Sequence, residues 1–238
     1  MSQFQFKQFS VQQNQTAMKV GTDGVLLGAW APIDHDPFAI LDIGAGTGLI
    51  ALMLAQRTDA EEIEAIEIDA HAHEQCVENF ENSPWNDRLF CFHSSLDAFM
   101  DELEAEEYDL IVSNPPFHTE AYFSGDEQRD AARFTASLPF KDLCEAAGLL
   151  LSEVGIFAVI VPFSAEETLV GLALENELYP LKITRVKGTP TTETKRSLLA
   201  FSKTKIENFP ITELVIETAR HQYTDDYIQL TKDFYLKM

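Results

Sequence analysis

The segment Asn114-Pro115-Pro116-Phe117 combines three properties that suit chemistry on a planar amino group. The Asn114 amide oxygen and the Pro115 carbonyl can both accept hydrogen bonds from one NH2 group, and the Phe117 ring offers a flat face for a base. The two prolines fix φ and remove backbone donors, so the carbonyls stay directed at a substrate. We therefore predict that these four residues form a catalytic loop, with a stiff exit turn as the alternative reading.

A second motif lies upstream, where an apolar run over residues 40–43 enters a glycine-rich turn and then a helical pattern. Gly44, Gly46 and Gly48 follow the spacing G-x-G-x-G, which differs from the dinucleotide fingerprint. Asp42 places a carboxylate just before this turn, which suits the cationic amino-acid part of S-adenosyl-L-methionine and would repel a pyrophosphate. We therefore expect S-adenosyl-L-methionine, and not NAD, as the cofactor.

An acidic strand end follows about 20 residues later, in the usual place for a ribose-binding acid of a βαβ nucleotide site. Residues 63–68 read as the second strand, and Glu67 is predicted to bind the ribose hydroxyls of the cofactor. Asp69 is better explained as the N-cap of the next helix.

These residues must be positioned by alternating strands and helices, which predict an α/β fold with a mainly parallel, doubly wound sheet. The expected strands are 39–43, 63–68, 89–94, 108–113, 156–161, 181–187 and 196–202. The expected helices are 48–57, 70–82, 137–151 and 165–177. Residues 4–11 alternate like one strand, and residues 211–238 suggest a strand followed by a helix.

Composition indicates a reduced, cytoplasmic protein without a membrane span. No apolar stretch approaches the roughly 18 residues needed to cross a bilayer, and no signal pattern opens the chain. Cys76, Cys91 and Cys144 are odd in number and lie in apolar segments, which favours free thiols over disulfides. His71 and His73 are two positions apart on a predicted helix, so we expect no metal site.

The net charge of −22 argues against a nucleic-acid partner, because phosphate contacts require cations. The distribution of charge weakens this objection. Residues 182–205 contain seven basic side chains and a single acidic one, Glu193. A basic stretch in an acidic chain fits the electrostatic footprint of a phosphate backbone. From it we select Lys187, Lys195 and Arg196 as substrate-binding candidates.

Together these motifs resemble class I S-adenosylmethionine-dependent methyltransferases that modify amino nitrogens. More narrowly, the chain is similar to the bacterial tRNA1(Val) (adenine(37)-N6)-methyltransferases in the following segments: residues 18–30, 41–48, 83–85, 114–117, 132–135 and 233–236. The resemblance covers nearly the whole chain. Its most selective segments are residues 19–30 and Ser83-Pro84-Trp85.

The resemblance implies a Rossmann-like domain with a seven-stranded sheet over residues 32–238, and a small N-terminal extension, residues 1–31, that packs over the cofactor and substrate site. It also assigns further roles. Thr22 and Asp23 would close the cofactor pocket. Ser95, with Asp97 two residues later as the alternative, stands near the cofactor adenine where the family commonly has an acid. Arg133 would hold the substrate loop or form a structural salt bridge.

The implied reaction is methyl transfer from S-adenosyl-L-methionine to the N6 amino group of an adenine in tRNA, within the anticodon loop of tRNA1(Val), without a metal. Asn-Pro-Pro-Phe followed by His118 also resembles ribosomal RNA guanine-N2 methyltransferases. DNA adenine and protein glutamine present the same kind of NH2 group, and a non-catalytic RNA-binding protein is the remaining alternative. The oligomeric state stays open, with a monomer favoured.

Overall fold

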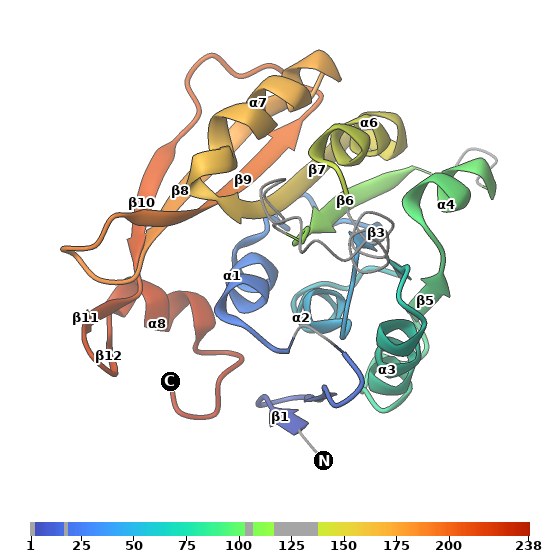
Figure 1. The fold of residues 1–238 in the computed structure, drawn as a ribbon, viewed down its shortest axis with the longest axis horizontal. Coiled ribbons are helices and arrows are strands. Elements are labelled where there is room, and N and C mark those ends of the chain that lie inside the picture. The colour runs from blue at the N-terminus through green and yellow to red at the C-terminus, as the bar shows by residue number, and fades with distance from the viewer. Residues whose placement is uncertain (1–2, 17–18, 103–106, 117–137) are drawn as a thin grey trace, which may run out of the picture.

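An eight-stranded sheet forms the centre of the protein (Figure 1). The computed structural model describes residues 3–16, 19–102, 107–116 and 138–238. From edge to edge the strands are β10 (Ile211–Val215), β8 (Tyr179–Lys187), β9 (Thr194–Ser202), β7 (Leu151–Pro162), β6 (Tyr108–Ser113), β3 (Ala39–Ile43), β4 (Glu62–Glu67) and β5 (Leu89–His93). Neighbouring strands are parallel, except that β9 is antiparallel to β7 and β8. This arrangement confirms the predicted α/β class. The sheet has eight strands where seven were expected, because β10, the strand predicted at the start of residues 211–238, joins its edge.

Helices cover both faces of the sheet, as Figure 1 shows. One face carries α1 (Thr22–Trp30), α2 (Leu49–Arg57), α3 (Ala70–Glu81) and α8 (Asp225–Thr231). The opposite face carries α4 (Leu96–Glu102), α6 (Phe140–Leu150) and α7 (Glu166–Glu175). Successive strand residues therefore enter different cores: Ile40 of β3 packs on the first side and Leu41 on the second. Burial on both faces explains why the central strands are continuous apolar runs.

Helix α1 was not assigned from the sequence, because it is buried nearly all round and so lacks the polar stripe of an amphipathic helix. It lies very close to α2. A Cβ atom on Gly28 would stand 2.7 Å from Sδ of Met53, and one on Gly24 would stand 3.1 Å from Leu49. Glycine at position 28 thus allows close contact between the two helices. Helix α1 therefore belongs to the same helical layer as α2.

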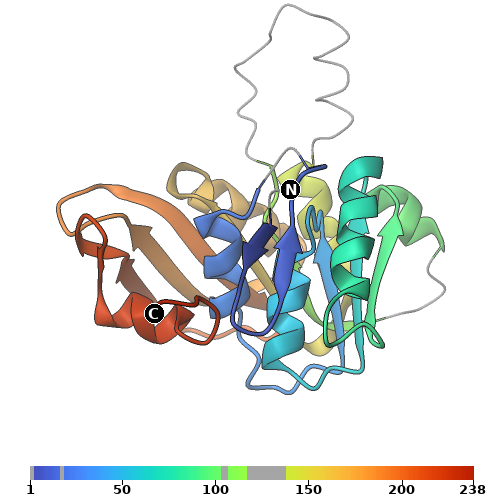
Figure 2. The ribbon, with the colours of Figure 1, turned by 90° about the horizontal axis from the view of Figure 1, so that it is seen from below.

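The N-terminal segment is a hairpin, which corrects the single strand expected over residues 4–11. Strands β1 (Gln3–Gln5) and β2 (Ser10–Gln12) are antiparallel, and the chain reverses where Phe6 N–H donates to the Phe9 carbonyl at 2.9 Å. The reversal stacks the buried rings of Phe6 and Phe9, whose centroids are 4.7 Å apart. Alternation alone cannot distinguish this from one long strand. Figure 2 shows the hairpin between α3 and the segment that follows α8.

All three cysteines are free thiols, as the sequence predicts. Cys76 and Cys144 are buried, and burial raises the pKa of the Cys144 thiol to about 12, so it stays protonated. Cys91 is partly exposed. Among the helices in the described ranges, none has the length and apolar character needed to cross a membrane.

Candidate active site

The glycine-rich turn joins β3 to α2 and has two different sides. Gly44, Gly46 and Gly48 all have positive φ angles, of 75°, 58° and 76°. A Cβ atom on Gly48 would lie 2.5 Å from the Phe80 ring, so this glycine lets the turn pack on α3. Cβ atoms on Gly44 and Gly46 would meet nothing within 4 Å. The first half of the turn therefore faces open space, where a ligand can approach the backbone.

Asp42 lies beneath this turn and is fully buried. Its Oδ2 accepts a hydrogen bond from Ala51 N–H at 3.2 Å, whereas its Oδ1 has no partner within the described part of the chain. Burial raises the pKa of Asp42 to about 7, against the Ala51 hydrogen bond, and the charge of Glu67 raises it further. A buried carboxyl with one unsatisfied oxygen fits a site that receives a cationic donor.

Glu67 ends β4 and holds the turn in place. Its Oε2 accepts from Gly46 N–H and its Oε1 from Asp69 N–H, each at 2.8 Å. Each carboxylate oxygen has a second lone pair, so the predicted contact with a ribose remains compatible with both bonds. Asp69 caps α3, because its Oδ1 accepts from Ala72 N–H at 2.8 Å, which confirms the N-cap prediction.

Asn114 stands directly beyond β6, at the same edge of the sheet as the glycine-rich turn. Ser113 pairs with Ile43 across β6 and β3, and its hydroxyl donates to the Ile43 carbonyl at 2.8 Å. The next residue, Asn114, has a buried Oδ1 without a hydrogen-bond partner in the described ranges. Pro115 is buried and Pro116 partly buried. Two unsatisfied acceptors, on Asp42 and Asn114, thus belong to adjacent strands.

Other predicted site residues have different environments. Ser95 caps α4, since its Oγ accepts from Ala98 N–H at 3.2 Å, and it is half-buried beside the end of β5. Thr22 and Asp23 open α1, where Thr22 is exposed. Phe117 and Arg133 lie outside the described residues.

The basic stretch is not a free cationic stripe. Arg196 donates from Nε to Asp23 at 2.8 Å. A residue predicted to bind RNA therefore pairs with a residue predicted to bind the cofactor. Lys187 pairs with Glu213 at 2.7 Å. Lys195 is exposed and sits where the β8–β9 register shifts, with one extra residue in β9. A bulge there changes the direction of side chains at the edge that holds the candidate site.

Asn79 is a supporting residue that the sequence reading missed. Its side chain donates to the Thr47 carbonyl at 2.9 Å and to the Gln12 carbonyl at 3.0 Å, and its Oδ1 accepts from Gln12 N–H at 2.7 Å. It therefore ties the glycine-rich turn to the N-terminal hairpin. The sequence does contain a signal for this role, because Asn79 is an amide three residues after Cys76 and next to Phe80, among apolar positions of the helix.

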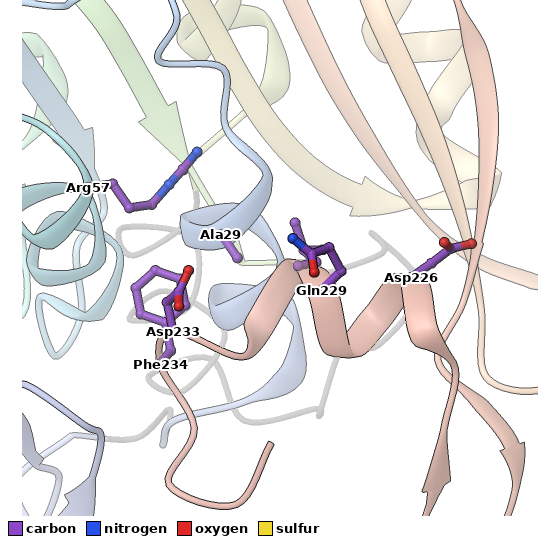
Figure 3. A pocket seen from close by; sticks show the side chains of 7 residues that line it. Ala29, Arg57, Asp226, Gln229, Asp233 and Phe234 are labelled. Carbon is purple, nitrogen blue, oxygen red and sulfur yellow. The ribbon is translucent and has the colours of Figure 1, made fainter.

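Two surface hollows are lined by residues other than those of the glycine-rich turn. One, of about 390 Å³, is at the far end of α2, between Arg57, Ala29 and the α8 region (Figure 3). The other, of about 510 Å³, is lined by Phe163, Lys187 and the 190–194 loop. Helix α2 starts at the turn and ends at Arg57, so the first hollow belongs to the opposite edge of the sheet.

Comparisons with known proteins identify the family of a chain with this geometry. Residues 29–132 match the family model described as methyltransferase small domain. A protein of Flavobacterium johnsoniae named tRNA1(Val) (adenine(37)-N6)-methyltransferase is 68% identical over 235 residues, which cover 99% of this chain and 100% of the relative. The chain belongs to the tRNA1(Val) (adenine(37)-N6)-methyltransferase family. A member from Haemophilus influenzae is 43% identical over 100% of both chains. The resemblance read from the motifs is thereby confirmed.

The fold of this tRNA1(Val) (adenine(37)-N6)-methyltransferase family member is also found among solved structures. A crystal structure described as a predicted O-methyltransferase from Agrobacterium tumefaciens superimposes with a TM-score of 0.71, over 89% of this chain and 96% of that chain, at 18% identity. At this identity the likeness concerns the fold alone, and it confirms the class I methyltransferase architecture. Within the described ranges, no group of three or more His, Cys, Asp or Glu residues is arranged to hold a metal.

Proposed function

We propose that this protein transfers a methyl group from S-adenosyl-L-methionine to the N6 amino group of adenine 37 in tRNA1(Val). One observation carries the proposal: a buried, unsatisfied Asn114 oxygen lies at the sheet edge that also holds the open glycine-rich turn. The names of full-length relatives at 68% and 43% identity support the substrate. Action on tRNA implies a cytoplasmic enzyme.

The residues around the turn fit the cofactor. The unsatisfied Oδ1 of Asp42 would accept from its ammonium group, and the open backbone at Gly44 and Gly46 would leave room for its amino-acid part. Glu67 would bind the ribose hydroxyls with the lone pairs that Gly46 and Asp69 do not use. When bound, the cofactor supplies an electrophilic methyl group on a positively charged sulfur. Ser95, at the end of the neighbouring strand β5, would contact its adenine.

Asn114 and Pro115 would act on the acceptor nitrogen. In adenine the N6 lone pair is delocalised into the ring. Two acceptors, Asn114 Oδ1 and the Pro115 carbonyl, would hold the two N–H groups and favour the lone pair in the direction of the methyl group. Pro116 keeps the loop rigid, and Phe117 would stack on the base. Catalysis then consists of positioning and polarisation, and the surplus proton leaves to solvent after transfer.

We also infer that residues 1–31 close the site from one side, as the extension in this family would. The ion pair between Asp23 and Arg196 supports this inference, because it ties the start of α1 to β9 at the active edge. Asn79 supports it as well, since it links Gln12 of the hairpin to Thr47 of the glycine-rich turn.

The deciding experiment transfers labelled methyl groups from S-adenosylmethionine to bulk tRNA, ribosomal RNA and DNA, followed by nucleoside digestion. The proposal predicts N6-methyladenosine in the tRNA fraction, and its loss when adenine 37 of a tRNA1(Val) transcript is replaced by guanine. N2-methylguanosine in ribosomal RNA would instead establish the guanine enzyme. Label in protein alone would move the acceptor to a glutamine side chain.

A further inference from the structure

A second aromatic ring lies near the candidate site, outside the catalytic loop. Phe163 begins the short 3-10 helix η1 (Phe163–Ala165) directly after β7, and the residue is 40% exposed. It lines the hollow of about 510 Å³ together with Lys187 and the 190–194 loop between β8 and β9. Its side chain thus supplies an aromatic surface to the lining of this hollow.

Strand register places Phe163 beyond Asn114, at the end of the neighbouring strand. Strands β6 and β7 are parallel neighbours, and Ser113 pairs with Val159. Asn114 is one residue beyond this pair and Phe163 four, so the backbone of Phe163 lies at most about 10 Å further along the strand direction. The target adenine at Asn114 and a ligand on Phe163 would thus lie side by side at one edge, as two neighbouring nucleotides of an unstacked strand can.

One side of the ring lies against Arg185. The Arg185 guanidinium carbon is 5.3 Å from the ring centroid, a cation–π geometry. Arg185 in turn donates to the carboxylate of Glu166, from Nη2 at 2.7 Å and from Nε at 3.2 Å to both oxygens. The buried hydroxyl of Ser197 donates to the same carboxylate. One member of the basic stretch therefore fixes an aromatic platform, and its charge is already neutralised by Glu166.

The rim of the hollow has the chemistry of a nucleotide site. Lys187 pairs with Glu213, whose side chain is 50% exposed, and such surface pairs contribute little, so the lysine can turn to a phosphate. Thr191 adds a hydroxyl group from the loop, whereas the Thr192 hydroxyl already donates to the Thr189 carbonyl at 2.9 Å, and Glu193 lines the same hollow. An aromatic face with a cation and a hydroxyl at its edge matches the combination that single-stranded nucleic acids bind.

We propose that the Phe163 hollow binds a nucleotide adjacent to the methylated adenine, with its base stacked on Phe163 and its phosphate near Lys187. The inference rests on the proposed function and adds a second base platform to the catalytic loop. Holding a neighbouring base out of the anticodon-loop stack would lower the energy needed to present the target base to Asn114.

The test compares Phe163→Ala and Phe163→Tyr with Phe38→Ala, which removes an exposed ring at the start of β3, on the opposite edge of the sheet. Methylation of a tRNA1(Val) transcript by the unmodified protein comes first and tests the proposed function separately. We expect Phe163→Ala to raise KM for tRNA roughly tenfold or more, with cofactor affinity unchanged. Phe163→Tyr keeps the ring and should stay near the starting value. An unchanged KM in Phe163→Ala, or an equal rise in Phe38→Ala, would overturn the proposal.

A double-mutant cycle identifies the neighbour. Transcripts with an abasic site immediately before or immediately after adenine 37 are methylated by the unmodified protein and by Phe163→Ala. If the ring stacks on one of these bases, that abasic site and the substitution are not additive, because both remove the same contact. Additive effects at both positions would contradict the inference even if KM rises.

Discussion

The carboxylate of Asp23 accepts a 2.8 Å hydrogen bond from Nε of Arg196, which joins the first turn of α1 to β9 across 173 residues. Both side chains are about one-third exposed or less. The pair links α1 to β9, whose first residue lines the Phe163 hollow. It therefore connects the region expected to bind the cofactor with the region expected to bind RNA.

A double-mutant cycle of Asp23→Asn and Arg196→Met measures this link. Partly exposed pairs contribute roughly 0.2–1 kcal/mol, so we expect a coupling free energy of unfolding in that range. Affinity for S-adenosylmethionine should fall in either single variant and no further in the double variant. Urea unfolding and titration calorimetry provide the two readouts. Additive losses would show that each residue contacts its own ligand.

Lys195 is the basic residue at the β9 bulge that is exposed to solvent, and it should carry an RNA contact. We predict that Lys195→Glu weakens tRNA binding and reduces the slope of log K against log salt by about 1. Lys205→Glu is the matched control, because Lys205 is exposed beyond the other end of β9. The same change of slope in both variants would indicate a general charge effect and no local site.

Asn114→Ala should abolish methyl transfer without loss of stability. Loss of a positioned polar group of this kind lowers kcat about a hundredfold or more. The buried Oδ1 has no hydrogen-bond partner among the described residues, so its removal should leave the free energy of unfolding within about 1 kcal/mol. Cofactor affinity should be retained in calorimetry.

The neighbouring Ser113→Ala is the control for that variant. Ser113 donates to the Ile43 carbonyl at 2.8 Å, so its truncation should cost about 1 kcal/mol of stability while kcat changes less. If Asn114→Ala retains most of the activity, the Asn-Pro-Pro segment is only a turn.

The raised pKa of Asp42 predicts that stability and cofactor affinity depend on pH in opposite directions. Burial raises its pKa to about 7. A pKa raised on folding stabilises the folded protein at low pH, and this contribution disappears as pH rises from about 4 to about 7. Cofactor binding needs the ionised carboxylate, so affinity should fall by about tenfold per pH unit below pH 7. Titration calorimetry across this pH range measures the effect.

Asp42→Asn separates the two contributions. The neutral side chain should bind the cofactor weakly at every pH, and should stabilise the ligand-free protein more above about pH 7 than near pH 5. A cofactor affinity of the unmodified protein that does not vary with pH would remove the role assigned to Asp42.

The sequence predicts β3 and β6 at their observed bounds, because burial on both faces makes them continuous apolar runs between turn residues. It also indicates the turn at Gly44–Gly48 and the N-cap Asp69, which depend on local chemistry. It misses α1, whose uniform burial leaves no periodic signal, and it merges the β1–β2 hairpin into one strand.

Contacts between distant segments account for the remaining differences. Residues 182–205 read as a free basic surface, but Arg185 meets Glu166, Lys187 meets Glu213 and Arg196 meets Asp23 only after the sheet has formed. Phe163 has no local pattern at all. Its position is set by the length of β7 and by the loop between β8 and β9.

The clasp between the N-terminal hairpin and the segment after α8 constrains the order of folding during translation. Lys7 N–H donates to the Phe234 carbonyl at 2.8 Å, and the rings of Phe6 and Tyr235 lie 5.9 Å apart. The N-terminal hairpin can therefore make these contacts only after residues more than 200 positions later have been synthesised. The Asn79 contacts between Gln12 and the glycine-rich turn therefore gain the support of the C-terminal segment only late in synthesis.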